Sequence, residues 1–349
     1  MLYWLGQSLE NFYGPFRLLT SHLFLGGLST ILCFILSFYF LPKLMGLLPT
    51  DRGRAHAIQS GASKGKPTGA GVIFVSIFTI VQIFMLPPSL QAWGILGITF
   101  LEMLSGYFDD SSKDSWGEYK KAIFDAVLAI GAAAVLCEMQ DVHMWLPFTT
   151  RIFMIPPIVF IPGGAILIWT SINCTNCSDG VDGLSGTLSA LAFATLGALL
   201  YFVIGHKEVA TYLLLPHYQD GAVWGMMAFS MVGCILGYLW YNANPSVLLM
   251  GDAGSRAIGF LLGVFVIKSG NPFTIFIVSA VLLINGGTGL VKVALLRFLK
   301  FSLFKSIRFP LHDHARHNKG WSNTQVLVRF TLIQAMIMIV LLVTLLKVR

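Results

Sequence analysis

Charged residues are scarce in this sequence. Asp, Glu, Lys and Arg make up 11% of its 349 residues, whereas soluble domains contain about a quarter. Hydrophobic residues account for 56% of the chain, and the mean hydropathy is +0.75. This composition excludes a disordered chain and an ordinary soluble enzyme. It predicts a polytopic membrane protein whose helices face lipid and one another.

The sequence also lacks the cysteine pattern of a secreted disulfide scaffold. Its five cysteines are odd in number and lie mostly in apolar stretches. Cys174 and Cys177 have the spacing of half a zinc site, but no second pair follows them. Residues 1–20 have neither a basic start nor a small-residue cleavage site, so we expect no signal peptide.

Repeats, low-complexity stretches and linkers are absent as well, and we therefore expect a single domain over residues 1–349. The net charge of +7 is not gathered in a basic domain outside the apolar segments. Nucleic acid is therefore not an expected partner, and the charge is better explained by membrane topology.

Ten apolar segments have about the length that a membrane-spanning helix needs. They lie near residues 19–48, 69–86, 91–108, 119–137, 152–171, 184–205, 222–240, 256–269, 272–299 and 325–346. The eighth is short, and the first and ninth are long enough to tilt or protrude. We expect an all-α membrane protein without strands, because lipid-exposed sheet edges are not tolerated in a bilayer.

Basic residues are divided unevenly between the two sets of loops that ten spans create. Fourteen of the 23 Lys and Arg residues lie on one side, at helix ends or in loops. These are Arg52, Arg54, Lys64, Lys66, Lys113, Lys120, Lys121, Arg256, Arg297, Lys300, Lys305, Arg308, Arg316 and Lys319. The positive-inside rule places this side in the cytoplasm and both termini outside. Most acids also lie on this side, which topology does not explain.

The first acidic cluster is Asp109-Asp110, at the end of the third span. Adjacent carboxylates at a membrane surface repel each other, and a cation would relieve the repulsion. Mg²⁺ suits such a site because it takes one or two carboxylates together with substrate phosphates. The alternative is a solvated helix end with Lys113 as its partner.

The second cluster runs from Asn176 through Asp179-Gly180-Val181-Asp182. If a helix has begun, the two carboxylates share one face. The glycines permit close approach of a ligand to the backbone, and the amides at a helix start favour an anion. The alternative is a capped helix start with turn glycines.

The third cluster contains Asn242, Leu249 and the run Gly251-Asp252-Ala-Gly254-Ser255. It offers a carboxylate, a hydroxyl and an accessible backbone between two spans. An ordinary turn with an Asp cap would have the same composition.

The fourth cluster lies between Pro310 and Trp321 and includes His312, Asp313 and His314. Histidine at this density suits hydrogen bonding or proton handling around phosphates better than metal binding, since the other candidate ligands are hard oxygens. A basic loop that contacts lipid headgroups is the alternative.

The fifth cluster, Lys64-Gly-Lys66-Pro-Thr68-Gly-Ala-Gly71, precedes the second span. It supplies cations and exposed backbone, as phosphate binding requires, but it does not match a P-loop. Five polar clusters, far apart in sequence, thus share one predicted membrane face. They predict a single site for a metal-bound pyrophosphate substrate and a lipid acceptor.

These motifs, in this order, resemble the polyprenyl-phosphate N-acetylhexosamine-1-phosphate transferase superfamily, and within it the phospho-N-acetylmuramoyl-pentapeptide transferase (MraY) branch. The resemblance covers essentially the whole chain. It rests on the opening Met-Leu-Tyr-Trp-Leu, the Asp-Asp pair, Asn-x-x-Asp-Gly-x-Asp-Gly, Met-Gly-Asp-x-Gly-Ser and Pro-Leu-His-x-His with Lys-Gly-Trp. The opening and the histidine segment favour this branch over sister N-acetylglucosamine-1-phosphate transferases.

The resemblance implies ten transmembrane helices, a homodimer and a cytoplasmic active site in a bacterial cytoplasmic membrane. It implies Mg²⁺-dependent transfer of phospho-MurNAc-pentapeptide from UDP-MurNAc-pentapeptide to undecaprenyl phosphate, giving lipid I and UMP. The catalytic residues that it implies are Asp109, Asp110, Asp179, Asp252, His312 and His314. Asp252 is the expected Mg²⁺ ligand, with Asp179 completing the acidic cluster.

The resemblance also implies a set of substrate-binding residues. These are Lys64, Lys113, Lys121, Asn176, Gly180, Val181, Asp182, Asn242 and Leu249, with Lys66 and Lys120 as rival alignments for Lys64 and Lys121. Three departures from the family pattern affect these roles. Asp313 replaces the middle residue of a triple histidine, Lys66-Pro-Thr-Gly-Ala-Gly71 replaces Thr-Pro-Thr-Met-Gly-Gly, and Leu249 stands where an aromatic residue is common.

Two other functions fit parts of the pattern. A sister enzyme would use UDP-GlcNAc as its donor. A transporter would place ionisable groups near the membrane midplane. Glu102 and Asp125 are the main intramembrane acids, and the spacing of Lys121 and Asp125 allows a local ion pair on one helix.

Overall fold

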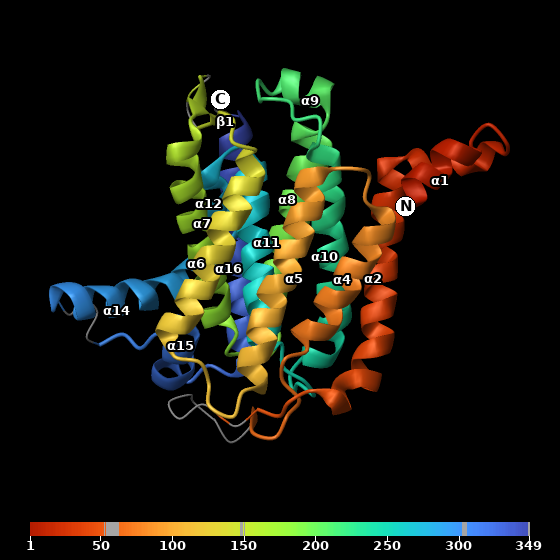
Figure 1. Ribbon diagram of the computed structural model, residues 1–349. Helices are drawn as coiled ribbons and strands as arrows, with labels where there is room; N and C mark the ends of the chain where they lie inside the picture. The colour runs from red at the N-terminus through yellow and green to blue at the C-terminus, as the bar shows by residue number, and fades with distance from the viewer. Residues whose placement is uncertain (52, 54–62, 147–148, 150, 302–305, 348–349) are drawn as a thin grey trace.

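The computed structural model describes the chain except for residues 52, 54–62, 147–148, 150, 302–305 and 348–349. Long helices run roughly side by side in a bundle (Figure 1). Helix α15 lies at one end of the bundle, and α9 and β1 lie at the opposite end together with the C-terminus. The described part of the chain is all-α apart from one two-stranded hairpin.

The long helices are α2 (His22–Leu44), α4 (Gly71–Met85), α5 (Leu90–Ser111), α6 (Glu118–Cys137), α7 (Pro157–Ser178), α8 (Leu184–Ala198), α10 (Gly221–Asn242), α11 (Gly251–Lys268), α14 (Thr288–Leu299) and α16 (Asn323–Lys347). The shorter elements are α1 (Leu2–Leu9), η1 (Gly14–Thr20), η2 (Met45–Leu47), β1 (Val142–Trp145), β2 (Ile152–Ile155), η3 (Leu199–Ile204), α9 (Lys207–Tyr212), η4 (Pro272–Thr274), α12 (Ile275–Val278), α13 (Ala280–Leu282), η5 (Leu283–Gly287) and α15 (Leu311–Lys319). Among the described residues, six helices are long and apolar enough to cross a membrane.

The expectation that the chain has no strands is wrong. Strands β1 and β2 pair antiparallel, with Val142 opposite Ile155 and Trp145 opposite Ile152. The predicted span 152–171 therefore starts as a strand, and its helix α7 begins only at Pro157. Pro156 and Pro157 explain the shift, because a proline has no amide hydrogen and is well suited to the first position of a helix.

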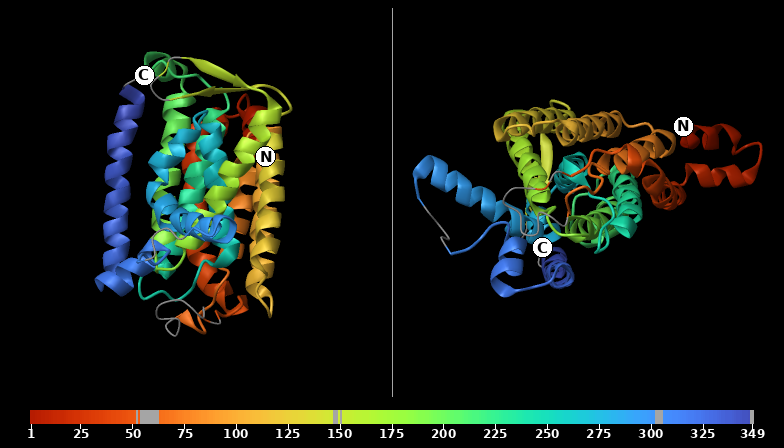
Figure 2. Two further views of the ribbon diagram at one scale, coloured as in Figure 1. Left: turned by 90° about the vertical axis from the view of Figure 1, so that its left-hand side faces the viewer. Right: turned by 90° about the horizontal axis from the view of Figure 1, so that it is seen from below.

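The predicted ninth span, 272–299, is broken into short pieces. Helices α12 and α13 are followed by the π-helical turn η5 and then by α14, which projects sideways from the bundle (Figure 2). The break lies at Ser279, and the π-helical turn η5 ends with Gly286-Gly287, where α7 approaches closely. A Cβ on Gly286 would lie 2.5 Å from the carbonyl oxygen of Cys174. Glycine thus permits both the contact and the turn in the chain.

The histidine segment, predicted as part of a loop, forms helix α15. It begins after Pro310 and ends at Gly320, whose φ of +65° gives a left-handed C-cap. Of its histidines, the helix buries His312.

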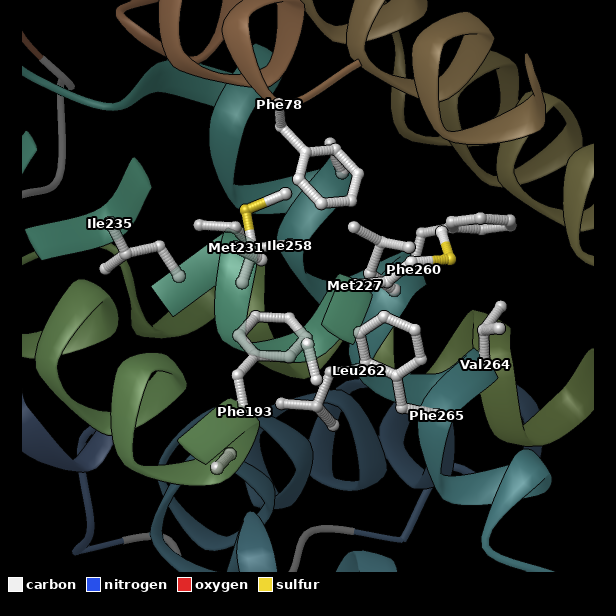
Figure 3. Packing of buried hydrophobic residues seen from close by; sticks show 14 of the residues in the cluster. Phe78, Phe193, Met227, Met231, Ile235, Ile258, Phe260, Leu262, Val264 and Phe265 are labelled. Atoms are coloured by element: carbon white, nitrogen blue, oxygen red, sulfur yellow. The ribbon is translucent and has the colours of Figure 1, made fainter. Parts of the chain in front are cut away.

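Helix α11 is the centre of the fold. Every residue from Gly251 to Ile267 is buried, and the helix packs mainly against α5 and α7. Figure 3 shows its apolar residues against Phe193 of α8, and the Phe193 and Phe265 rings meet edge to face at 5.7 Å. Because other helices surround α11, the residues of its first turn are held in fixed positions.

The position of Arg256 differs from the expectation that it lies at a helix end. The sequence placed it among the cytoplasmic basic residues, but it lies inside α11 and is 2% exposed. Arg52, Arg54 and Lys305, which were counted in the same set, lie outside the described residues.

Candidate active site

Three helices bring a lysine and two carboxylates together at the first turn of α11. Lys121, at the start of α6, places its Nζ 2.9 Å from Oδ2 of Asp252. The same ammonium forms an ion pair with Asp109, at the end of α5. Asp109 also accepts a hydrogen bond of 2.6 Å from the backbone amide of Trp116. One cation therefore balances two nearly buried carboxylates.

Asn176 of α7 completes the surroundings of Asp252. Its side-chain amide donates to Asp252 Oδ1 at 2.9 Å and to Ser255 Oγ at 3.0 Å. Burial alone would raise the pKa of the Asp252 carboxyl, but Lys121 and Asn176 hold it below its ordinary value. The Asp252 carboxylate is therefore ionised at neutral pH, and its two oxygens are held in a fixed orientation.

Asp110 has a different partner from its neighbour in sequence. Its carboxylate accepts the backbone amides of Asp252 at 3.0 Å and Ala253 at 3.1 Å, and so caps the N-terminus of α11. Burial and the charge of Asp252 raise the pKa of Asp110 to about 7. Gly251 has a φ of +70°, and its missing Cβ leaves room for this carboxylate.

The Lys66 segment packs against the loop that precedes α11. The amide of Leu249 donates to Pro67 O at 2.8 Å, and the amide of Ala70 donates to Leu249 O at 3.1 Å. Lys66 Nζ donates to Ser246 Oγ at 3.1 Å. Lys64 is exposed. Of Lys64 and Lys66, it is thus Lys66 that contacts the loop before α11.

Asp182 and Asn242 connect the second cluster to the third through hydrogen bonds. Asp182 accepts both the hydroxyl of Ser246 at 2.8 Å and its amide at 3.2 Å. Asn242 accepts the amide of Gly183 at 2.8 Å and donates to Leu248 O at 2.9 Å. Both side chains therefore hold the loops of the site in place, and their contact with substrate remains a prediction.

His312 is the buried histidine of the fourth cluster. Its amide donates to Asn285 Oδ1 at 2.9 Å, and its ring Nδ1 lies within hydrogen-bond distance of the same side chain. Asn285 donates in turn to Ser178 Oγ at 2.9 Å. Nε2 of His312 faces Gly180, since a Cβ there would lie only 2.4 Å away.

The rest of the histidine motif lies nearer the surface. His314 Nδ1 accepts a 3.4 Å hydrogen bond from the amide of Arg308. Asp313 lies 3.6 Å from Arg316 Nη1 and 3.8 Å from His312 Nε2. The residue that replaces the middle histidine thus forms an ion pair with Arg316 within its own helix and lies close to His312.

The other predicted site residues lie around this centre. Asp179 follows the last residue of α7, and the adjoining Val181 is buried. Lys113 is exposed in the loop between α5 and α6. The five segments therefore converge at one end of the bundle, while the catalytic, ligand and substrate roles of their residues remain predictions.

Sequence reasoning identified Glu102 and Asp125 but missed that Arg256 joins them below this site. Arg256 lies among Glu102, Ser105 and Asp125, and its ion pair with Asp125 replaces the pair of Lys121 with Asp125 that their spacing allowed. The spacing could have indicated this set of charges, because residues 252 and 256 are one helical turn apart and therefore share one face of the helix. Ser246 and Asn285 were also missed, and a polar residue within an apolar run is the signal for Asn285.

The donor set fits a magnesium ion that binds together with its substrate. Asp109 and Asp252 offer hard carboxylate oxygens on either side of a single positive charge. In the described ranges, no three His, Cys, Asp or Glu side chains are grouped to hold a metal ion alone. Substrate phosphates would therefore supply the remaining ligands, as is usual for Mg²⁺.

Comparison with known proteins shows the family of the chain. Residues 92–270 match the model of glycosyl transferase family 4. The chain is 46% identical to the phospho-N-acetylmuramoyl-pentapeptide-transferase of Treponema pallidum (strain Nichols), over 98% of this chain and 95% of the relative. It is 29% identical to the enzyme of the same name from Helicobacter pylori (strain J99), over 92% and 94% of the two chains. The chain belongs to the phospho-N-acetylmuramoyl-pentapeptide-transferase family.

Proposed function

We propose that this chain transfers phospho-MurNAc-pentapeptide from UDP-MurNAc-pentapeptide to undecaprenyl phosphate, releasing UMP and forming lipid I. One observation carries the proposal. In a chain of this family, three separate helices bring Asp109, Lys121 and Asp252 together at the first turn of α11. This site has the charge and the hard oxygen donors that a pyrophosphate substrate with Mg²⁺ requires.

The reaction is a direct displacement at phosphorus. An oxygen of the acceptor phosphate forms a bond to the sugar-linked phosphorus of the donor. The bond from that phosphorus to the bridging oxygen breaks, and UMP leaves with the electron pair. A phosphomonoester has its second pKa near 6, so the acceptor is already largely ionised at neutral pH and needs no strong base.

The residues of the site stabilise charge and hold the reacting groups. Lys121 places a positive charge beside the position of the pyrophosphate, where negative charge spreads in the transition state. Asn176 fixes the orientation of the Asp252 carboxylate. When bound through Asp252, with Asp109 or Asp179 nearby, Mg²⁺ would neutralise the pyrophosphate and favour the departure of UMP.

The proposed setting is the bacterial cytoplasmic membrane. Ten spans with both termini outside would place the site in the cytoplasm, where the basic loops are expected. A homodimer is part of the same proposal. Support comes from the apolar helices and from the convergence of the polar loops at one end of the bundle (Figure 1).

The donor assay tests the reaction. Purified protein in detergent is given undecaprenyl phosphate and Mg²⁺ with either UDP-MurNAc-pentapeptide or UDP-GlcNAc, and UMP release is measured. We expect release from the muramyl donor alone. Release from UDP-GlcNAc alone would move the chain to the sister activity, and release from neither by folded protein would refute the proposal. Rapid quenching that traps an aspartyl phosphate would replace the direct displacement with a two-step route.

The Asp252→Asn variant tests the site. It should lower turnover by about a hundredfold to a thousandfold, because the ionised ligand at the centre of the site is lost. Asp114→Asn, at an exposed position in the loop between α5 and α6, is the matched control and should keep normal turnover. Normal turnover in Asp252→Asn would remove this residue from the reaction.

A further inference from the structure

A second layer of charge lies one helical turn below the candidate site, on the same three helices. On α11, Arg256 follows Asp252 by four residues, and on α6, Asp125 follows Lys121 by four. On α5, Ser105 precedes Asp109 by four. Residues four apart lie on one face of a helix, so each helix presents one group to the site and another to the deeper layer.

Arg256 is the centre of this deeper layer. Its Nη2 donates to Ser105 Oγ at 2.8 Å and forms an ion pair with Asp125, and its Nε lies 3.3 Å from Glu102 Oε1. All three charged side chains are at most 3% exposed. They are too deep to contact a substrate at the membrane surface, and the proposed reaction does not use them.

Stability does not explain this network. Buried ion pairs often contribute less than well-packed apolar residues of similar size, because both charges lose their hydration. Within the described structure, neither carboxylate oxygen of Glu102 receives a hydrogen bond. Ionisable residues inside a membrane are costly and are usually retained for a functional reason.

The contact between α5 and α11 shows what the network can control. Gly106 lies against the backbone of α11, where a Cβ would be 2.4 Å from the carbonyl oxygen of Asp252. This backbone contact brings the two helices together, and the Asp110 carboxylate holds the first turn of α11, which leaves the rotation of the next turn to be set. Arg256, which reaches α5 and α6 at once, supplies that constraint.

We propose, resting on the proposed function, that Arg256 is a positioning residue that locks α11 against α5 and α6 and so holds Asp252 facing Lys121 and Asp109. The guanidinium suits this role because its planar fork can contact partners on two helices together, which an ammonium group does less well. Arg256 acts through Asp252 and does not touch the reacting atoms.

The test compares three full-length proteins with the wild type. One carries Glu102→Gln, Asp125→Asn and Arg256→Met, which removes the whole network without leaving an unpaired charge. The second is Arg256→Lys. The third, Lys268→Met with Asp220→Asn, is the control because it removes an ion pair of 2.5 Å at the far end of the same helix.

Two measurements distinguish positioning from general stability. Hydrogen exchange is followed at the amides of Asp252 and Ala253, which are bonded to Asp110. Turnover with UDP-MurNAc-pentapeptide is resolved into kcat and KM, and the melting temperature is recorded. Because exchange does not depend on turnover, a wild type without activity would contradict the proposed function and still leave this inference tested.

The triple variant should exchange these two amides faster, with kcat lower by about tenfold to a hundredfold and KM for the donor nearly unchanged. Arg256→Lys should show a smaller change of the same kind, and it decides the question if the triple variant does not fold. The control pair should leave both amides and kcat as in the wild type. Wild-type exchange in either Arg256 variant, or equal effects in the control, would overturn the proposal.

Discussion

Lys121 Nζ lies 2.9 Å from Asp252 Oδ2 and forms an ion pair with Asp109 through the same ammonium. The next lysine in the chain points elsewhere, because Lys120 Nζ lies 3.6 Å from the centre of the Trp116 ring. Adjacent residues of one helix thus have different environments. Lys121, and not Lys120, lies beside Asp109 and Asp252, a choice that the sequence motifs leave open.

Replacing Lys121 with methionine should lower kcat by about a hundredfold or more, because the methionine keeps much of the side-chain length and removes the charge that we propose to face the pyrophosphate. Lys120→Met is the matched control and should stay within about twofold of the wild type, since an exposed cation–π contact contributes little. UMP release measures both variants. Equal losses, or a loss confined to Lys120→Met, would contradict the assignment.

Gly106→Ala should destabilise the protein by about 1–3 kcal/mol, because the new methyl group would meet the backbone of α11 and force the helices apart. Gly97 is in the same helix with nothing within 4 Å of its Cβ position. Gly97→Ala should therefore be neutral or slightly stabilising. Thermal unfolding in detergent compares the two, and similar melting temperatures would show that α5 and α11 are not in the described contact.

Gly180→Ala should lower kcat/KM by about tenfold, because a Cβ 2.4 Å from His312 Nε2 displaces the imidazole from Asn285. Gly163→Ala, at an open position in α7, should have no effect. A double-mutant cycle with His312→Ala identifies the cause. If Gly180→Ala costs as much activity in the His312→Ala background as in the wild type, the loss does not pass through this histidine.

Removal of divalent metal should abolish UMP release, since the proposed reaction needs Mg²⁺ to neutralise the pyrophosphate. The assay is run with EDTA and then with excess Mg²⁺, which should restore turnover fully. Ca²⁺ prefers longer bonds and more ligands, so it should restore turnover poorly. Undiminished release in EDTA would exclude an essential metal ion.

Hydropathy predicted the helices well where the composition of a segment alone determines its secondary structure. The apolar runs near 91–108, 119–137 and 222–240 are helical in α5, α6 and α10. It failed at residues 152–155, which form a strand, because pairing with residues 142–145 is not visible in the local composition. It also missed the π-helical turn at Leu283–Gly287, where Gly286 lies against α7.

Motifs identified the segments of the candidate site but not the partners of each side chain. Asp109 and Asp110 are adjacent in the sequence, yet one pairs with Lys121 and the other caps α11. The spacing of Asp125 allowed a pair with Lys121, but Asp125 contacts Arg256. Spacing along one helix shows which residues share a face. It does not show which neighbouring helix that face meets.

The sequence by itself determined that this chain is a polytopic membrane protein with its chemistry-bearing residues in five polar segments at predicted helix ends. Burial of apolar side chains and satisfaction of backbone hydrogen bonds within each helix depend mainly on local composition, which explains this success. Only the tertiary structure decided that Lys121 joins Asp109 to Asp252 and that Arg256 lies buried beneath them. Those contacts depend on how each helix is rotated and on where glycine allows two backbones to meet.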